Sequence, residues 1–534
     1  MMELSLAAQK LIQKYQESLL LSQPKEGEPT IYVDEIASKV AHFYEKIRGV
    51  VDWKEEHLIR RGAIERALKR RMISEISGFG LVSNLKAEEM AEPLVVELIR
   101  GGHFPNGKIP QGKIGDVQRV LEKYISVLER GPQAKNNSLK NKVRFYNWIL
   151  EIAACEIEEI LDPPFKENNL IEFMTDLMVE RIRVNSGAVI TEEEKRVQTY
   201  IAVHRALFHL DSPIITYHLL QYRYPEWATE DILSVWESIE EDLSHPLSTK
   251  FLKVCERHDT LYLLLGDVLE MLSGSPSEIP EKIFEPHLLQ GLVRKAYDQR
   301  LKTLKSRLFR MAVYSTLSIF ISSAFALFVI EVPLAKLFYG RFSPLAITVD
   351  ILVPTLLMFL LVALARPPEK SNLERVLAEI VKIVYQREEK DVYEIKIRKK
   401  RNFLISFVVS FLYLLGSFLS LGLIVGIFYL ARVPPTSIII DTFNVAVVVF
   451  AGLIIRRRAR ELTVEEERAN FLELLFDTLS VPVAKIGKKL SAKWREYNII
   501  SVFFMALIDL PFQTFIELIE SWSLFLKEKK GEIR

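Results

Sequence analysis

Four long apolar stretches constrain the fold of this 534-residue chain more than any other feature. They cover residues 311–330, 345–365, 403–430 and 437–455, and none of them contains Lys or Arg. An α-helix needs about 20 apolar residues to cross a bilayer, and a soluble helix of that length would carry a polar face. The sequence therefore predicts four transmembrane helices.

The Lys and Arg residues that flank these stretches predict their orientation. Fifteen of them lie on the side that holds residues 1–309, 366–402 and 456–534, and three lie on the other side. Flanks rich in Lys and Arg stay in the cytosol. We therefore expect a multi-pass protein of the cytoplasmic membrane with both termini in the cytosol. Only short loops, at 331–344 and 431–436, would face outward.

Composition excludes several classes of protein. The chain is 49% hydrophobic and 26% charged, which is too apolar for a disordered polymer. Two Cys cannot form a disulfide framework. A net charge of +1 gives no strong field for a polyanion, so nucleic acid is not expected as a partner. Residues 1–23 are interrupted by charges and do not predict a secretory signal.

The remaining apolar residues recur mostly at helical spacing, as in the run Val117, Val120, Leu121 and Tyr124. This pattern predicts an all-α fold. We expect four regions in chain order: two cytosolic helical regions, a four-helix membrane domain with a cytosolic connector at 366–402, and cytosolic amphipathic helices. Their predicted bounds are 1–135, 136–309, 310–456 and 457–534.

Two acidic residues and one Asn interrupt the apolar stretches. Asp350 and Asp441 lie within about two turns of the external ends of their stretches, and Asn444 follows Asp441 by one turn. An ionised carboxylate costs about 2.5–3.5 kcal/mol at mid-bilayer and so marks a candidate functional site. Two interpretations stay open, because these carboxylates could instead reach water or pair with Arg341 or Arg432.

The third stretch carries a line of small residues at spacings of three and four. Small residues let membrane helices approach closely and form hydrogen bonds across the contact. This line predicts helix packing or dimerisation, and a polar pore lining is the alternative. Its members are Ser406, Ser410, Ser417 and Ser420, with Tyr413 between the second and third, and Gly422 and Gly426 add a GxxxG spacing.

Basic residues near the membrane ends predict contact with anionic lipid headgroups. Residues 484–496, which follow an expected break at Pro482, read as a basic amphipathic helix on the membrane surface. Residues 498–527 are interfacial, re-entrant or packed on the cytosolic domain, and the sequence does not choose among these. The predicted lipid contacts are Lys399, Lys400, Arg401, Arg456, Arg457, Arg458, Lys485, Lys488, Lys489 and Trp494.

Known catalytic motifs are absent from the sequence. It contains no GxxxxGK[ST] phosphate loop, no HExxH zinc pair and no GxSxG nucleophile elbow. His204 and His209 are five residues apart and do not share a helix face, so a metal site with His258 and Asp259 is not predicted. Cys155 and Cys255 are expected to be buried apolar residues. We therefore expect no catalytic residues, no metal and no cofactor, although an enzyme is not excluded.

Two further segments have both a functional and an ordinary interpretation. The basic cluster at 60–71 could contact nucleic acid or lipid, or it could be a solvated helix face. The aromatic segment at 206–227 could be a recognition surface, or its rings could pack in a core.

The sequence leaves three functions open. The leading hypothesis is a membrane-anchored scaffold whose cytosolic helices bind a protein partner or a second copy. The alternative is an oligomeric channel or transporter with a polar site at Asp350, Asp441 and Asn444. A membrane-bound enzyme comes third, because no convergent set of catalytic residues is found.

Overall fold

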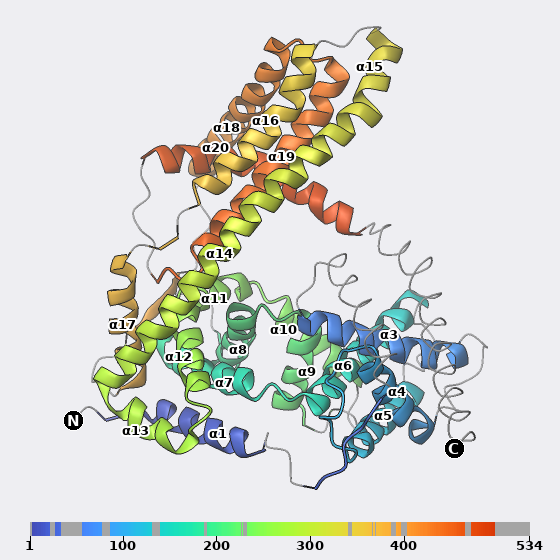
Figure 1. Ribbon diagram of the computed structural model, residues 1–534, viewed down its shortest axis with the longest axis vertical. Coiled ribbons are helices and arrows are strands. Elements are labelled where there is room, and N and C mark those ends of the chain that lie inside the picture. The colour runs from blue at the N-terminus through green and yellow to red at the C-terminus, as the bar shows by residue number, and fades with distance from the viewer. Residues whose placement is uncertain are drawn as a thin grey trace, which may run out of the picture. The chain divides into compact units, whose positions relative to one another are not determined.

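The computed structural model describes most of the chain, and nearly all of its regular structure is helical (Figure 1). The predicted all-α class is confirmed, with two short strands as the exception among the described residues. The described residues are 3–21, 27–33, 56–76, 86–130, 139–185, 190–225, 227, 232–339, 344–365, 367–368, 370–385, 391–396, 403–464 and 471–496.

The chain divides into two compact units, which group it differently from the four predicted regions. We call them the helical unit, built from 9–180 and 190–255, and the membrane unit, built from 1–8, 181–189 and 256–498. The chain leaves the helical unit after residue 180, contributes a strand to the membrane unit and then returns. Hydropathy along the sequence carries no signal for such an excursion.

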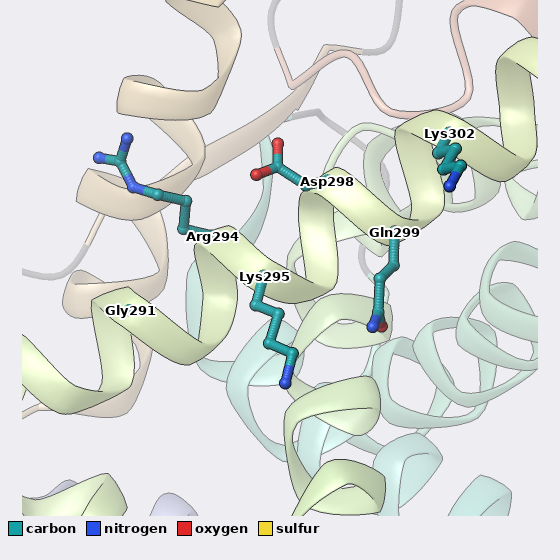
Figure 2. A pocket seen from close by; sticks show the side chains of 6 residues that line it. All are labelled: Gly291, Arg294, Lys295, Asp298, Gln299 and Lys302. Carbon is teal, nitrogen blue, oxygen red and sulfur yellow. The ribbon is translucent and has the colours of Figure 1, made fainter.

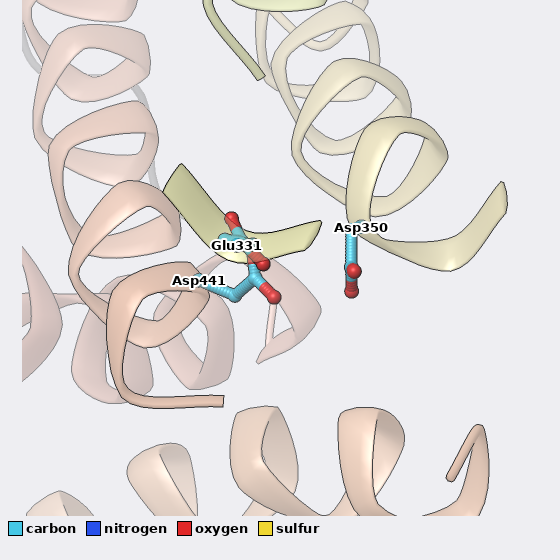
Figure 3. Close-up of side chains that lie close together, drawn as sticks. All are labelled: Glu331, Asp350 and Asp441. Carbon is cyan, nitrogen blue, oxygen red and sulfur yellow. The ribbon is translucent and has the colours of Figure 1, made fainter. Parts of the chain in front are cut away.

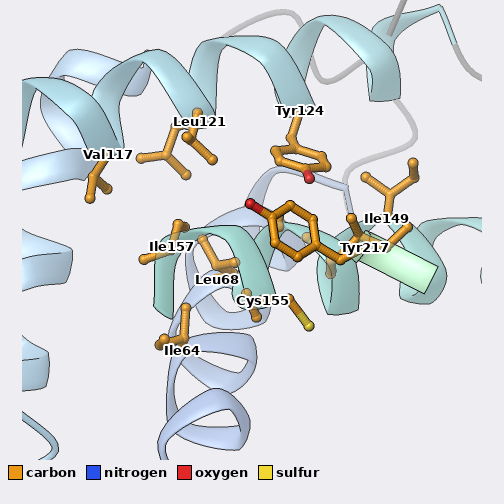
Figure 4. Packing of buried hydrophobic residues seen from close by; sticks show 14 of the residues in the cluster. Ile64, Leu68, Val117, Leu121, Tyr124, Ile149, Cys155, Ile157 and Tyr217 are labelled. Atoms are coloured by element: carbon orange, nitrogen blue, oxygen red, sulfur yellow. The ribbon is translucent and has the colours of Figure 1, made fainter. Parts of the chain in front are cut away.

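Ten helices are described in the helical unit, counting α1, whose first residues belong to the membrane unit. Its core lies mainly between α3, α5, α6 and α9, where Ile64, Leu121, Ile149 and Tyr217 are buried together (Figure 4). The helices are α1 (Leu6–Leu21), α3 (Glu56–Ile76), α4 (Ala87–Arg100), α5 (Lys113–Glu129), α6 (Leu139–Leu161), α7 (Phe165–Arg181), α8 (Glu192–Phe208), α9 (Ser212–Arg223), α10 (Ile232–Leu243) and α11 (Ser248–Cys255).

The aromatic segment at 206–227 packs in this core. Tyr217 and Trp227 are both buried, and the ring of Trp227 lies 5.4 Å from that of Tyr124 between centroids. Tyr222 is partly exposed and stacks on Tyr200 at 5.3 Å. Most of the segment's rings therefore stabilise the fold, which favours the ordinary interpretation.

Basic side chains of the cluster at 60–71 form ion pairs within the helical unit. Arg61 is 7% exposed and forms a two-pronged ion pair with Asp211, in which Nη1 lies 2.6 Å from Oδ1. Arg70 and Arg71 both pair with Glu97 of α4. These side chains hold α3 against its neighbours, so the cluster is not a free cationic patch.

The membrane unit contains the four apolar helices. Within the described residues, four helical stretches are long and apolar enough to cross a bilayer, at 286–338, 344–363, 406–430 and 435–459. The elements of this unit are β1 (Ile182–Asn185), α12 (Asp259–Met271), η1 (Pro276–Glu278), α13 (Ile279–Phe284), α14 (Pro286–Ala326), η2 (Leu327–Glu331), α15 (Val332–Tyr339), α16 (Pro344–Ala363), α17 (Lys370–Val384), β2 (Tyr393–Lys396), α18 (Phe403–Leu430), α19 (Pro435–Ala459) and α20 (Phe471–Glu496).

The first apolar helix is longer than the sequence analysis expected. α14 begins at Pro286, well before residue 311, and its helix continues through η2 and α15 to Tyr339. The expected loop at 331–344 is therefore wrong over most of its length. Pro333 does not end the helix, and it lies two residues after the π-helical turn of η2.

Two strands were not foreseen. β1 and β2 pair in parallel, with Ile182 opposite Tyr393 and Asn185 opposite Lys396. Each strand has four residues, which is too short for an alternating pattern to stand out. The connector at 366–402 thus holds both α17 and β2.

The expected break at Pro482 is also wrong. α20 runs through Pro482 and packs against α18 and α19. Val483 and Ala484 are buried in the same apolar cluster as Val445 of α19. The part of α20 around Val483 and Ala484 is therefore packed against other helices and does not lie on a membrane surface.

Candidate functional site

Three carboxylates from three helical segments converge inside the membrane unit. Glu331 ends η2, Asp350 lies in α16 and Asp441 lies in α19 (Figure 3). One carboxylate oxygen from each residue lies within 4.8 Å of the others. We call these three residues the carboxylate cluster.

Helix geometry explains why Asp350 and Asp441 meet. Pro344 and Pro435 are the first residues of α16 and α19, a position that suits proline. Each Asp follows its Pro by six residues, which at 1.5 Å per residue is a depth of about 9 Å. Because α16 and α19 pack against each other, the two carboxylates lie at the same level.

Glu331 reaches the cluster from a π-helical segment. η2 has five residues, Leu327–Glu331, and interrupts an otherwise continuous α-helix. π-helical turns occur frequently at functional sites, because they change which side chains face a neighbour. The sequence analysis missed Glu331 by assigning it to a loop. An acidic residue directly after an apolar run was the available signal.

All three carboxylates are removed from solvent. Asp350 is 1% exposed, and Asp441 and Glu331 are each 2% exposed. Both oxygens of Asp350, Oε2 of Glu331 and Oδ2 of Asp441 have no hydrogen-bond partner among the described residues. A buried carboxylate without donors is costly, so the cluster favours neutralisation, either by a proton or by a bound cation.

One neutral group shares this environment. Ser437 lies one turn before Asp441 on α19, is fully buried, and its Oγ finds no partner in the described part of the chain. The hydroxyl lies near the Glu331 carboxyl without forming a hydrogen bond to it. The walls nearby are apolar and include Ala346 and Ile438.

Asn444 does not join the cluster. Its Nδ2 donates to Oγ of Ser323 on α14 at 3.0 Å, and Ser323 is 4% exposed. This contact ties α19 to α14 one turn beyond Asp441. The expected pairing of Asp441 with Arg432 is not observed, since Arg432 is exposed, and Arg341 lies outside the described residues.

Most of the small residues in the line on α18 are not covered by other described parts of the same chain. Ser406 and Ser410 are exposed, whereas Ser420 is buried. Ser417 and Ser420 donate to carbonyls of α18 itself, at 2.8 and 3.1 Å. A side chain added at Gly422 or Gly426 would meet nothing within 4 Å. The line therefore stays a prediction of packing between copies.

The predicted lipid contacts fall into two groups. Arg456, Arg457 and Arg458 form the last turn of α19. On α20, Lys488 and Lys489 are exposed, and Lys485 lies 4.3 Å above the ring of Tyr413. Trp494 lies in α20, but its side chain is outside the described residues, as are Lys399, Lys400, Arg401 and the segment at 498–527.

A shallow pocket follows α14 before its apolar part (Figure 2). It measures about 370 Å³ and is lined by three basic residues, Arg294, Lys295 and Lys302, with one acid, Asp298. The lining comes from one face of one helix. This surface adds to the basic residues that flank the first membrane stretch.

The histidines noted in the sequence form no metal site among the described residues. His204 and His218 are joined at 2.9 Å between Nε2 and Nδ1, and His218 contacts Glu159 at 2.5 Å. Burial and the neighbouring His218 lower the pKa of His204 to about 3. His258 instead stacks on Tyr393 at 4.2 Å.

The cysteines are buried, as expected. Cys155 and Cys255 both have 0% exposure, and burial raises the pKa of the Cys155 thiol. A buried thiol of this kind is a poor nucleophile. Neither residue suggests catalysis.

The carboxylate cluster is the only group of three or more His, Cys, Asp or Glu residues in the described ranges whose ligand atoms converge. No family model, no curated protein and no solved structure matches the chain. The chemistry of the site follows from its own residues. Three carboxylates and one hydroxyl in apolar surroundings can bind a cation and replace part of its hydration shell.

Proposed function

We propose that this protein passes a cation across the membrane as a channel or transporter, with the carboxylate cluster as its binding site. The observation that carries the proposal is the convergence of Glu331, Asp350 and Asp441 within 4.8 Å, buried among membrane helices. Acidic groups inside membrane segments are expensive and commonly mark ion pathways. This is the alternative that the sequence analysis left open.

A polar line on α19 supports a pathway as well as a site. Ser437, Asp441 and Asn444 are spaced by four and three residues, so they share one face of the helix. Asn444 continues the line one turn deeper, where it bonds Ser323. A cation would enter from the end where α16 and α19 begin, exchange water for carboxylate oxygens about 9 Å inside, and leave along this line.

The proposed setting follows the flanking charges. The ends of α14 and α19 that carry Lys and Arg would face the cytosol, with both termini on that side and anionic headgroups as neighbours. The site would then open toward the outer face. Because four spans are few for a pore, two or more copies would associate through the open face of α18 at Gly422 and Gly426.

The scaffold function stays a prediction. It rests on the size of the helical unit and on the absence of a catalytic motif in the sequence. Purification of the tagged protein in mild detergent, followed by identification of what co-elutes, tests it directly. A stoichiometric protein partner would favour the scaffold over transport.

Cation flux into proteoliposomes tests the proposal. The matched variants Asp350→Asn and Asp441→Asn keep side-chain shape and remove charge. We expect each to reduce flux at least about tenfold, because each removes one of three charges in a low-dielectric site. Glu374→Gln is the control, since Glu374 is exposed on α17 outside the membrane stretches.

Two results would count against the proposal. One is wild-type protein, correctly reconstituted, that passes no cation above the level of empty liposomes. The other is flux that Asp350→Asn and Asp441→Asn leave at the level of Glu374→Gln.

A further inference from the structure

We infer that the carboxylate cluster binds one hard divalent cation, of the class of Mg²⁺, Ca²⁺ and Mn²⁺, with the hydroxyl of Ser437 as a fourth protein ligand. The inference shares its site with the proposed function and names the ion class. It does not require that the ion crosses the membrane. Nothing in the sequence analysis foresaw it, since no metal was expected.

The spacing of the oxygens fits a single ion. Ca²⁺ takes oxygen ligands at about 2.3–2.6 Å and Mg²⁺ at about 2.0–2.1 Å. Ligands on opposite sides of such an ion are therefore about 4–5 Å apart. The oxygens of Glu331, Asp350 and Asp441 lie within 4.8 Å of one another, so one ion can touch all three.

The ligand type selects the ion class. The cluster offers carboxylate oxygens and a hydroxyl, and it contains no His or Cys among the described residues. Hard oxygen ligands suit Mg²⁺, Ca²⁺ and Mn²⁺, whereas Zn²⁺ and Cu⁺ prefer nitrogen and sulfur. The set therefore discriminates against the softer transition metals.

The side chain of Ser437 also indicates that a ligand binds here, independently of the three carboxylates. Its side chain is 0% exposed, and its Oγ has no hydrogen-bond partner within the described residues. Residues four apart share a helix face, so Ser437 and Asp441 point the same way. The hydroxyl lies near Glu331 but forms no hydrogen bond to it. A cation bound by both the carboxylates and the Ser437 hydroxyl would explain why this buried hydroxyl has no hydrogen-bond partner.

Charge favours a divalent over a monovalent ion. When all three carboxyl groups are ionised they carry three negative charges, and the described neighbours of the site bring no Lys or Arg into an ion pair with them. With a divalent ion bound, the net charge of the site would be −1, and with a monovalent ion it would be −2. Because the walls are apolar and the local dielectric is low, the smaller residual charge is favoured.

The protein supplies too few ligands to enclose the ion. Four groups provide four oxygens, or more where a carboxylate binds through both, and these ions take six to eight. Water would fill the remaining positions. A site that keeps water exchanges its ion more readily than a closed cage, which suits an ion that enters and leaves.

Mn²⁺ binding to the full-length protein in detergent tests the inference. Chelator-treated protein is titrated with Mn²⁺ alone, free Mn²⁺ is read by electron paramagnetic resonance, and the melting temperature is followed in parallel. We expect one Mn²⁺ per chain, displaced by Ca²⁺ or Mg²⁺, and a higher melting temperature with the ion, because ligands stabilise the folded state they bind.

The variants assign the ligands. Asp350→Asn and Asp441→Asn should each weaken Mn²⁺ binding at least about tenfold, and Ser437→Ala should weaken it several-fold. Ser437→Ala removes one oxygen and preserves the helix, so it tests the site even if a carboxylate variant fails to fold. Glu374→Gln should bind as the wild type does.

Each outcome bears on the inference. Folded wild-type protein that binds no Mn²⁺, or binding that Ser437→Ala and Asp350→Asn leave unchanged, overturns it. Flux of a monovalent ion without Mn²⁺ binding overturns the ion class and leaves the proposed function standing. Specific Mn²⁺ binding without flux supports the inference and overturns the transport proposal.

Discussion

Single residues of this chain handle buried charge in two ways. In the helical unit, Arg61 and Asp211 satisfy each other through two hydrogen bonds. In the membrane unit, Asp350 has two buried oxygens with no donor among the described residues. The first arrangement stabilises a fold, because each charge has its counter-ion. The second leaves a buried carboxyl group without a counter-ion among the described residues, and the proposed cation would supply one.

The buried histidine pair gives a pH-dependent prediction. Burial lowers the pKa of His204 to about 3, against about 6.5 for an unfolded chain. The unfolded state therefore takes up the proton first as the pH falls. The contribution of His204 to the free energy of unfolding is fully present above about pH 6.5 and is lost progressively as the pH falls toward 3. At pH 5 the loss is about 2 kcal/mol relative to pH 7.5.

Comparison of the wild type with His204→Gln isolates this effect. The full chain in detergent is unfolded with denaturant at both pH values, and hydrogen exchange of α8 and α9 reports the helical unit. We expect the variant to be less stable at pH 7.5 but to lose about 2 kcal/mol less on acidification. An equal acid loss in both proteins would show that His204 does not titrate in this way.

Residue-scale prediction reached part of the site. Asp350 and Asp441 were found because charge inside an apolar stretch is visible in the sequence. The sequence did not predict that these two residues lie close together, because their proximity depends on the packing of α16 on α19. Glu331 was missed because hydropathy ends the helix at the first charge, whereas the chain continues through η2 into α15.

At the scale of elements, a close contact between α16 and α19 holds the cluster together. Gly452 of α19 lies against Leu361 of α16, and a Cβ added at Gly452 would be 2.5 Å from Leu361 Cδ1. Small residues permit such approaches between membrane helices. The contact lies far from the carboxylates but fixes the helices that carry them.

Gly452→Val and Gly422→Val form a matched pair. Gly452→Val should push α16 from α19, lower the melting temperature in detergent by several degrees and weaken Mn²⁺ binding. Gly422→Val meets nothing within 4 Å in a single chain and should leave both unchanged. It should instead reduce cross-linking between copies if α18 is the self-association face. Equal destabilisation by both variants would contradict the observed α16–α19 packing.

Element prediction succeeded where the signal is long and failed where it is short. Apolar stretches of about 20 residues located four helices, since a stretch of that length is what an α-helix needs to cross a bilayer with all its backbone hydrogen bonds made internally. β1 and β2 have four residues each and carry no such signal. Pro482 was expected to break α20, but packing against α18 and α19 outweighs the local cost.

At the scale of the whole membrane unit, α14 links its two ends. The first half of α14 packs against α12, α13 and α17, where Arg300 pairs with Asp267 and Tyr297 contacts Asn372 at 3.0 Å. The second half packs against α16 and α19 and leads through η2 to Glu331 (Figure 1). One continuous helix therefore connects the α12–α17 region with the carboxylate cluster.

A crystal structure of the protein grown with Mn²⁺, with the ion located by anomalous scattering, tests most directly whether the carboxylate cluster binds a cation. We expect one strong peak between α16, α19 and η2, about 2.2 Å from oxygens of Glu331, Asp350 and Asp441. No peak at that place, or carboxylates that point away from one another toward lipid or water, would contradict it.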